Sequence, residues 1–456
     1  MKSSLVKVST LGAAIFAATS ATAGGFDNTD RNFDIIYGDS NIITTQYGQT
    51  AVPMKANINK VQRAQTSVAE ANAKVVGSGE VIGDHIRPQI GFRYQLAKGV
   101  TCAAKVEQPF ATKISFADDQ YAYIKTNSNG LPIDANGNPT ADPSNMATAG
   151  APIDTRYESE SFTMACGYTM ALSQGQITAF AGPKIQRVSG FFNQDLTPSP
   201  TDLGEADNLT VELDGGTEFG YVAGMAYEIP EIALRASFLY HSQVDYDAKG
   251  SITAKIPGAV SFSTTGTART FTPQTLELAL KSGLAENTLG FIKMRWSEYS
   301  KLSTLNVTGD DSKTIDGSQF TIAQANQASG NLLDPLINPG LEMFTNDTFD
   351  YTIGIGQRIS DQLSLGTSFT GSTKLGSKPD NTPAGADSTS LRLPNHTSYT
   401  LAFGGEYALM KHLKLHGGLG YTFIDSFIIE TPTEEFKAEF GKTEATSFQF
   451  GLTYEI

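Results

Sequence analysis

The stretch TPQTLELALKSGLAENTLGFIKMRWSEYS, residues 272–300, decides the fold. Apolar residues occupy every second position on both sides of the segment GLAEN: Leu276, Leu278, Leu280, Ile292, Met294 and Trp296. The positions between them include Glu277, Lys281, Lys293 and Arg295. Period-two alternation predicts two strands, because successive side chains point to opposite faces. One face is charged and the other apolar, so one of them must be enclosed.

The same alternation recurs along the chain, in segments such as IRPQIGFRYQL, GVTCAAKVEQPF, EFGYVAGMAYEI and YTLAFGGEYAL. We expect fourteen strands, at roughly 41–60, 80–96, 99–116, 157–172, 174–191, 208–229, 231–247, 268–284, 286–304, 346–360, 362–374, 394–410, 412–426 and 441–456. Most of them reach the roughly 9 to 11 residues that a tilted strand needs to cross a bilayer.

The connections alternate between short and long. AKG, SQGQ, IPE, AEN, SDQ and MKH are tight turns, and the long connections are 61–79, 117–156, 192–207, 248–267, 305–345, 375–393 and 427–440. Short periplasmic turns and long outer loops are typical of an outer-membrane barrel. The sequence therefore predicts an all-β, transmembrane antiparallel barrel of about 14 strands. Its apolar face meets lipid and its charged face lines the lumen, because a Lys or Arg facing the acyl chains costs about 2 to 4 kcal/mol at the midplane.

The N-terminal sequence MKSSLVKVSTLGAAIFAATSATAGGF predicts an exported protein of a Gram-negative bacterium. A basic start, a short apolar run and the small residues Ala21-Thr22-Ala23 are typical of a signal peptide over residues 1–23. Residues 24–40 form a short N-terminal segment before the barrel at 41–456. The formal net charge of −14 argues against a nucleic-acid partner, which calls for clustered basic residues.

No motif predicts catalysis, a cofactor or a metal site. The five histidines have no metal-ligand spacing, and no nucleophile motif accompanies them. Cys102 and Cys166 fall on strands that should be antiparallel neighbours. In an exported protein such a pair favours a disulfide over two free thiols.

Several segments resemble the FadL family of outer-membrane transporters for long-chain fatty acids and hydrocarbons. They are residues 272–300, GYVAGMAYEIPEIALRASFLYHS, KVEQPF, AGPKIQRVSG and YTIGIGQRISDQLSLG, in the family's order. The resemblance implies a monomeric fourteen-stranded barrel. Family members often carry an N-terminal hatch followed by an Asn-Pro-Ala motif. Here GGFDNTDRNFDIIYGDSNIITTQYG leaves room only for a short plug segment, and that motif does not follow.

The resemblance also implies an apolar reception site in the third and fourth outer loops, 192–207 and 248–267. The residues available there are Phe191, Phe192, Leu196, Ile256, Val260, Phe262 and Phe271. Loop 305–345 adds Leu332, Leu333, Leu336, Ile337, Leu341, Met343 and Phe344. Ordinary packing within the loops is the alternative for each of them. Together they suit a hydrophobic ligand, because concave apolar sites with a few polar groups are typical ligand sites.

Charges predicted to line the lumen are Arg93, Lys105, Glu107, Arg235, Glu277, Lys281, Lys293 and Arg295. The cations among them would hold a carboxylate head group, or the set would only satisfy the polar barrel interior. Pro109 cannot donate to a strand ladder, so it is the candidate for the kink through which the family releases substrate sideways.

We therefore expect passive transport of hydrophobic molecules, long-chain fatty acids above all, by a protein that is not an enzyme. The expected partners are the substrate, outer-membrane lipid and lipopolysaccharide, and the barrel-assembly machinery, with the chain acting as a monomer. A general diffusion porin, or an adhesin or structural barrel, is the alternative.

Overall fold

The computed structural model of the chain describes residues 27–54, 56–61, 85–116, 122–124, 134, 136–140, 148–150, 153–195, 208–256, 260–343, 346–376, 396–430 and 436–456. The expected signal peptide, Leu196, Phe344 and the side chain of Ile256 lie outside what is described. Among these residues, no helix is long and apolar enough to cross a membrane.

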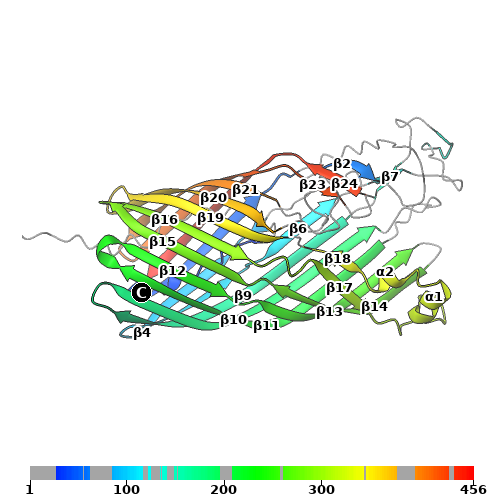
Figure 1. Cartoon of the computed structure of the whole chain (residues 1–456), viewed down its shortest axis with the longest axis horizontal. Helices are drawn as coiled ribbons and strands as arrows, with labels where there is room; N and C mark the ends of the chain where they lie inside the picture. The colour runs from blue at the N-terminus through cyan, green and yellow to red at the C-terminus, as the bar shows by residue number, and fades with distance from the viewer. Residues whose placement is uncertain are drawn as a thin grey trace, which may run out of the picture.

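Fourteen antiparallel strands close into a barrel, as the alternation predicts (Figure 1). They are β1 (Ile42–Ala51), β4 (Gln89–Ala97), β5 (Val100–Glu107), β9 (Ile153–Ala171), β10 (Gln176–Asp195), β11 (Asn208–Ile229), β12 (Leu234–His241), β15 (Thr275–Ala285), β16 (Thr288–Ser297), β19 (Asp347–Arg358), β20 (Leu363–Leu375), β21 (Ser398–Met410), β22 (Leu413–Ile424) and β25 (Thr443–Glu455). The barrel closes because β1 pairs with β25 on one side and with β4 on the other. Closure leaves no strand edge exposed to lipid.

The remaining elements lie mostly toward the end of the barrel opposite its tight turns (Figure 1). The strands among them are β2 (Ala56–Val61), β3 (His85–Ile86), β6 (Ala111–Phe116), β7 (Ala122–Ile124), β8 (Thr148–Gly150), β13 (Val244–Ile256), β14 (Val260–Thr272), β17 (Thr304–Gly309), β18 (Gly340–Glu342), β23 (Phe427–Glu430) and β24 (Phe436–Phe440). The α-helices α1 (Ile322–Ala328) and α2 (Asp334–Ile337) lie at this end too, whereas the 3₁₀ turn η3 (Pro230–Ile232) lies in a tight turn and η1 (Asp34–Ile36) packs on β4, β5 and β9. Because the tight turns mark the periplasmic end, we call the opposite end the outer end.

The structure shows which face of the strands in residues 272–300 is enclosed. On β15, Leu278 and Leu280 are exposed on the outside at 50% and 46%, whereas Glu277 is 7% exposed inside. Arg295 on β16 is Glu277's direct cross-strand neighbour and is also buried in the barrel. Lipid therefore covers the apolar face, and the charges lie in the lumen.

Toward the outer end of the wall, the two faces exchange their polarity. Within the lipid-facing part of β11, Phe219 and Tyr221 point outward and Glu218 points inward. Beyond a bulge at Gly215, where Val188 pairs with Gly216 but Ser189 with Asp214, Val211 and Leu213 are buried inside and Glu212 and Asp214 are exposed. The strands thus continue beyond the membrane with an apolar interior and a charged exterior.

This exchange corrects the expected loop boundaries. β10 continues to Asp195, and residues 244–256 and 260–272 form the strands β13 and β14, paired from Val244↔Thr272 to Ile256↔Val260. The sequence alternates there as well, but the outward positions become polar, so the pattern no longer matches a strand in lipid. The substrate residues expected in loops 192–207 and 248–267 therefore lie on strands wherever they are described.

A disulfide joins Cys102 on β5 to Cys166 on β9, with a sulfur–sulfur distance of 1.99 Å. The two residues are direct partners in the strand register. We expect both thiols of the folded protein to resist alkylation until a reductant is added, which mass spectrometry of maleimide-treated protein checks. Labelling of both cysteines without reductant would contradict the bond.

Candidate functional site

The outer half of the barrel encloses a large set of buried apolar side chains, which we call the outer apolar cluster. Its buried members are Phe110, Tyr157, Val188, Phe192, Leu209, Val211, Leu213, Val244, Tyr246, Ala248, Ile252, Ala254, Phe262, Ala268, Tyr299, Leu302, Leu305, Val307, Ile322, Leu336, Ile337, Leu341 and Met343. Val260, Phe271, Ile315 and Leu333 pack against it. A barrel lumen is usually polar, so this interior needs an explanation.

Four of the expected substrate residues belong to this cluster or pack on it. Phe262 on β14 is completely buried, Phe192 on β10 is 4% exposed, and Val260 and Phe271 pack against the buried set. The segment 305–343 contributes Leu336, Ile337, Leu341 and Met343, because its two short helices and β18 pack toward the same interior.

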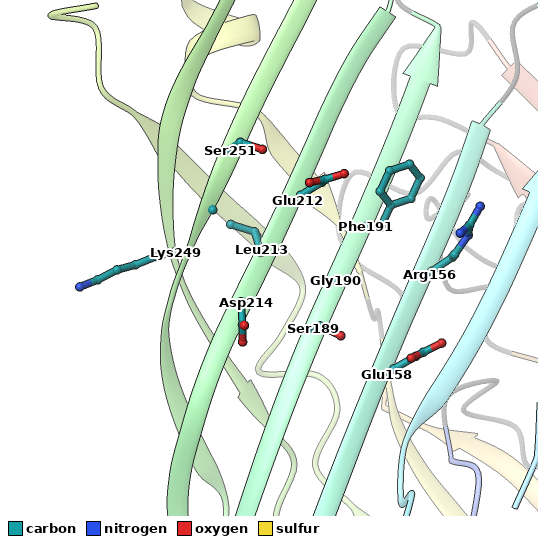
Figure 2. A pocket seen from close by; sticks show the side chains of 11 residues that line it. Arg156, Glu158, Ser189, Gly190, Phe191, Glu212, Leu213, Asp214, Lys249 and Ser251 are labelled. Atoms are coloured by element: carbon teal, nitrogen blue, oxygen red, sulfur yellow. The ribbon is translucent and has the colours of Figure 1, made fainter.

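Phe191 requires a correction. It neighbours Phe192 on β10, so strand alternation turns its ring to the exterior of the barrel. There it lies against the guanidinium of Arg156, 5.1 Å from the ring centre, and lines a groove on the outer surface (Figure 2). Phe191 is therefore not part of the outer apolar cluster that contains Phe192.

Residues 27–40, which we call the plug, lie inside the barrel beneath the outer apolar cluster. Arg31 connects the two regions, because its guanidinium stands 4.7 Å from the ring centre of Phe110. Arg31 also donates to the Ser297 hydroxyl on β16, and its carbonyl pairs with His241 Nε2 on β12 at 2.9 Å. These contacts reach several different strands, so the plug crosses the lumen rather than following one wall.

Four buried charges hold the plug in place. Arg295 on β16 forms ion pairs with Asp27 of the plug at 3.3 Å and with Asp350 on β19 at 2.5 Å. Arg31 pairs with Asp27 at 2.9 Å, and the hydroxyl of Tyr299 donates to the same carboxylate. The two cations and two anions balance, which matters because an unpaired buried charge is costly.

A second set of charges holds the middle of the plug. Lys293 lies 3.5 Å from Asp30 and 3.9 Å from Glu277. Lys105 donates to the carbonyl of Asn32 at 3.0 Å. Burial alone raises the pKa of Asp30, but the positive charges of Lys293 and Lys105 outweigh it and lower the pKa below its usual range. The carboxylate is therefore charged.

Aromatic and aliphatic side chains hold the periplasmic end of the plug. Phe33 and Tyr37 pack on the ring of Phe180 from β10, at centroid distances of 5.7 and 5.9 Å. The guanidinium of Arg235 stands 4.3 Å from the Tyr37 ring centre, and Arg93 donates to the Tyr37 carbonyl.

The eight charges predicted for the lumen thus face inward, and most of them bind the plug. Glu107 accepts from the Thr29 hydroxyl at 2.7 Å and pairs with Lys105 at 3.0 Å. Lys281 lies opposite Arg235 in the strand register. In the structure most of these charged groups interact with the plug. From the sequence, the cations among them were candidates to bind a substrate carboxylate.

The third barrel strand is interrupted at the expected proline. Glu107 of β5 pairs with Ser161, whereas Ala111 of β6 pairs with Glu158, so residues 108–110 bulge out of register with β9. The ladder between β4 and β5 also ends here, at Gln89↔Glu107. The carbonyl of Pro109 accepts from the backbone N–H of Asn28 at 2.8 Å, so the plug fills the break.

Asn28 bridges the two strands on either side of this break. Its side-chain amide donates to the carbonyls of Ile86 on β3 and Gln108, at 2.8 and 3.1 Å. One plug residue therefore replaces the ladder that the strands do not make with each other.

Sequence reasoning missed two polar residues at the base of the outer apolar cluster, Lys184 and Gln186 on β10. Lys184 is 6% exposed and donates to the Ser242 carbonyl at 3.1 Å; within the described residues no carboxylate pairs with it. Gln186 is 1% exposed and accepts from Thr272 at 3.2 Å, while its amide nitrogen has no partner among the described groups. Extending the inward alternation through AGPKIQRVSGFF would have found both.

These two residues and their inward neighbours make a polarity gradient along one strand. Lys184 and Gln186 come first, then Val188, and Phe192 is nearest the outer end. Val188 and Tyr246 approach each other over Gly215, which has no side chain. A Cβ atom at Gly215 would lie 2.5 Å from the Val188 side chain and 3.1 Å from the Tyr246 ring. The inner surface therefore changes from cationic to apolar within nine residues of strand.

Comparisons with known proteins agree with this architecture. Residues 158–456 match the family described as "Outer membrane protein transport protein (OMPP1/FadL/TodX)". A FadL homologue from Pseudomonas aeruginosa superposes with a TM-score of 0.62 at 14% identity, over 97% of this chain and 96% of that chain. The toluene transporters TbuX of Ralstonia pickettii and TodX of Pseudomonas putida give TM-scores of 0.55 and 0.53 at 13% identity, each over 96% of this chain and 98% of theirs. At these identities the structural likeness concerns the fold, and no curated protein matches the sequence.

Proposed function

The chain belongs to the OMPP1/FadL/TodX family of outer-membrane transport proteins, and from this premise we propose that it takes up long-chain fatty acids. The outer apolar cluster captures the acyl chain, the plug controls passage through the lumen, and the substrate leaves sideways at the break in the third strand. The exchange of polarity along the wall carries this proposal. An apolar interior above the membrane serves a molecule that cannot cross a polar outer layer on its own.

The gradient along β10 supports a substrate with one polar end. A hydrocarbon would leave the buried amide nitrogen of Gln186 unpaired and the ammonium of Lys184 with only the Ser242 carbonyl. A buried polar group that lacks a partner costs about 1 to 3 kcal/mol. A fatty acid with its carboxylate toward Lys184 and its chain toward Phe192 satisfies both surfaces. Charge-assisted hydrogen bonds to a carboxylate are the stronger kind.

The same interior counts against the general diffusion porin. A porin passage holds water along its whole length, and its lumen is polar. Here Phe262, Phe192 and their neighbours fill the outer half with apolar groups, and a charged plug crosses the lumen beneath them. An adhesin or structural barrel would need neither feature.

Replacing Pro109 with Ala tests the sideways release. Alanine restores a backbone donor at the break, and one ladder hydrogen bond stabilises by about 1 kcal/mol. The equilibrium between an open and a closed wall at the break should therefore shift toward the closed wall by roughly fivefold. We expect uptake of labelled oleate by cells to fall by about that factor, while oleate binding to the purified protein stays the same.

Pro183→Ala is the matched control, because Pro183 lies on a lipid-facing position of β10 opposite Tyr221, away from the break. It should leave uptake unchanged. If Pro109→Ala transports as well as the natural protein, release does not depend on the break, and the route through the wall is wrong.

A further inference from the structure

Four neighbouring strands form a groove of about 530 Å³ on the exterior of the barrel, beyond the lipid-facing part of the wall (Figure 2). Its side chains come from two cross-strand rows. One row contains Arg156, Phe191, Glu212 and Ser251, which are paired in register from β9 to β13. The adjacent row contains Glu158, Ser189, Asp214 and Lys249.

Small residues and a bulge hollow the wall at this place. Gly190 and Gly250 lie between the two rows. Strands approach closely at Gly250, where a Cβ would come within 1.7 Å of the Glu212 carbonyl. The bulge of β11 beside Ser189 adds local twist, since an extra residue bends the strand that contains it. Together these features make a concave surface on a wall that is otherwise regular.

The groove stands just beyond the interfacial layer of the bilayer. The outermost lipid-facing row is Phe162, Ile185 and Phe219, which are paired across β9, β10 and β11. Glu158 lies on β9 four residues from Phe162 toward the outer end, a rise of roughly 10 Å for a strand tilted by about 40°. The interfacial layer of a bilayer is only about 5 to 8 Å deep on each side. The groove therefore faces the layer just beyond the glycerol region, and acyl chains do not reach it.

The groove combines three kinds of group that recognise sugars. The ring of Phe191 offers an apolar face for the C–H face of a saccharide. The carboxylates of Glu158 and Glu212 accept hydrogen bonds from hydroxyl groups. Arg156 and Lys249 are cations, and guanidinium in particular pairs well with phosphate. A purely anionic or purely apolar ligand would leave part of this surface unmatched.

We propose that this groove binds the phosphorylated core saccharide of an outer-leaflet lipopolysaccharide. The sugar ring packs on Phe191, and its hydroxyls bond to Glu158 and Glu212. Phosphates lie against Arg156 and against Lys249, at the two opposite ends of the groove (Figure 2). Lipopolysaccharide of the outer leaflet would surround the barrel at this place, because the groove continues the lipid-facing wall. This site lies on the face of β10 opposite the outer apolar cluster and is independent of the proposed transport.

Asp214 is less available to this ligand than its neighbours. Arg187 from β10 pairs with it at 2.6 Å. The hydrogen bond from Arg187 lowers the pKa of Asp214, which keeps the carboxylate charged and paired. Among the described residues, no ion pair involves the acids Glu158 and Glu212 or the cations Arg156 and Lys249. The groove therefore matches a ligand with both hydroxyls and phosphate.

Native mass spectrometry of the full chain in detergent tests the proposal. The protein is titrated with purified lipopolysaccharide that has a complete core, and separately with lipid A that has no core sugars. We expect the natural protein to prefer the complete molecule. Phe191→Ala should weaken that binding by about threefold to tenfold, the effect of losing one aromatic contact, and should leave lipid A binding unchanged.

Arg269→Ala is the control, because Arg269 pairs with Asp247 on the same exterior wall but outside the groove. It should bind like the natural protein. Equal binding of complete lipopolysaccharide by Phe191→Ala and the natural protein would overturn the proposal, as would equal affinity for lipid A and the complete molecule. Fatty-acid uptake by Phe191→Ala should stay normal, so a failure here leaves the transport proposal standing.

Discussion

Replacing Arg295 with Ala is expected to release the plug from the lumen. The change leaves Arg31 as the one cation facing two buried carboxylates, because Asp350 loses its ion pair and Asp27 keeps only its pair with Arg31. Removing one partner of a buried ion pair costs about 3 to 5 kcal/mol. The barrel ladder is separate from these contacts, so the short plug is the part that can move and bring Asp27 into water. The population of the state in which the plug has left its site should rise by roughly 100-fold or more.

A reporter cysteine at Thr29→Cys measures this opening. Thr29 is 2% exposed, and the two natural cysteines form a disulfide, so the reporter supplies the free thiol. Its rate of maleimide labelling should rise by about 100-fold in the Arg295→Ala background.

Arg269→Ala, which breaks an exposed ion pair on the exterior, should leave the labelling rate of the same reporter unchanged. An equally slow rate in both backgrounds would mean that Phe33, Ile36 and Tyr37 hold the plug without the ionic network. The role assigned to Arg295 would then be withdrawn.

Phe262→Ala and Phe192→Ala should each lower fatty-acid uptake at limiting substrate by about tenfold or more, because a fully buried aromatic contact contributes about 1.5 to 3 kcal/mol. Both rings are buried in the outer apolar cluster, Phe192 on β10 and Phe262 on β14. The measurement is the initial rate of labelled oleate uptake, with barrel abundance determined in parallel.

Phe191→Ala is a closely matched control. It removes the same side chain from the adjacent position of β10, but from the exterior face, so oleate uptake should not change. A porin would behave differently: sugars and ions would pass freely, and none of the three substitutions would alter their passage. That result would be consistent with the barrel fold but would contradict the proposed uptake of fatty acids.

The wall of the barrel was predictable because lipid imposes one rule on every strand within it. Leu278 and Glu277 must face opposite ways, so residues 272–300 reveal both strands and their enclosed face. The outer extensions obey a different rule. Past Phe162 on β9, water replaces lipid, Glu160 and Glu158 face outward, and the alternation continues with its polarity exchanged. The strand ends were misplaced for that reason.

The contacts of the plug could not be predicted from the sequence. The segment DNTDRNFD has no regular alternation of polar and apolar residues that would show which strands its side chains contact. Sequence placed Arg295 and Lys293 in the lumen, but their partners Asp27 and Asp30 lie more than 260 residues away. Tertiary structure alone brings them together. Pro109 was different, because the missing N–H of proline marks a ladder break wherever it lies.

Photo-crosslinking of a diazirine-labelled fatty acid to the purified full chain, followed by peptide mapping, would locate the substrate. If the protein captures fatty acids as proposed, adducts should concentrate on inward positions of β10, β13 and β14 around Phe192 and Phe262, and excess unlabelled oleate should compete them away. Adducts confined to lipid-facing residues such as Phe219 and Leu278, unaffected by competitor, would contradict a fatty-acid site in the outer half of the barrel.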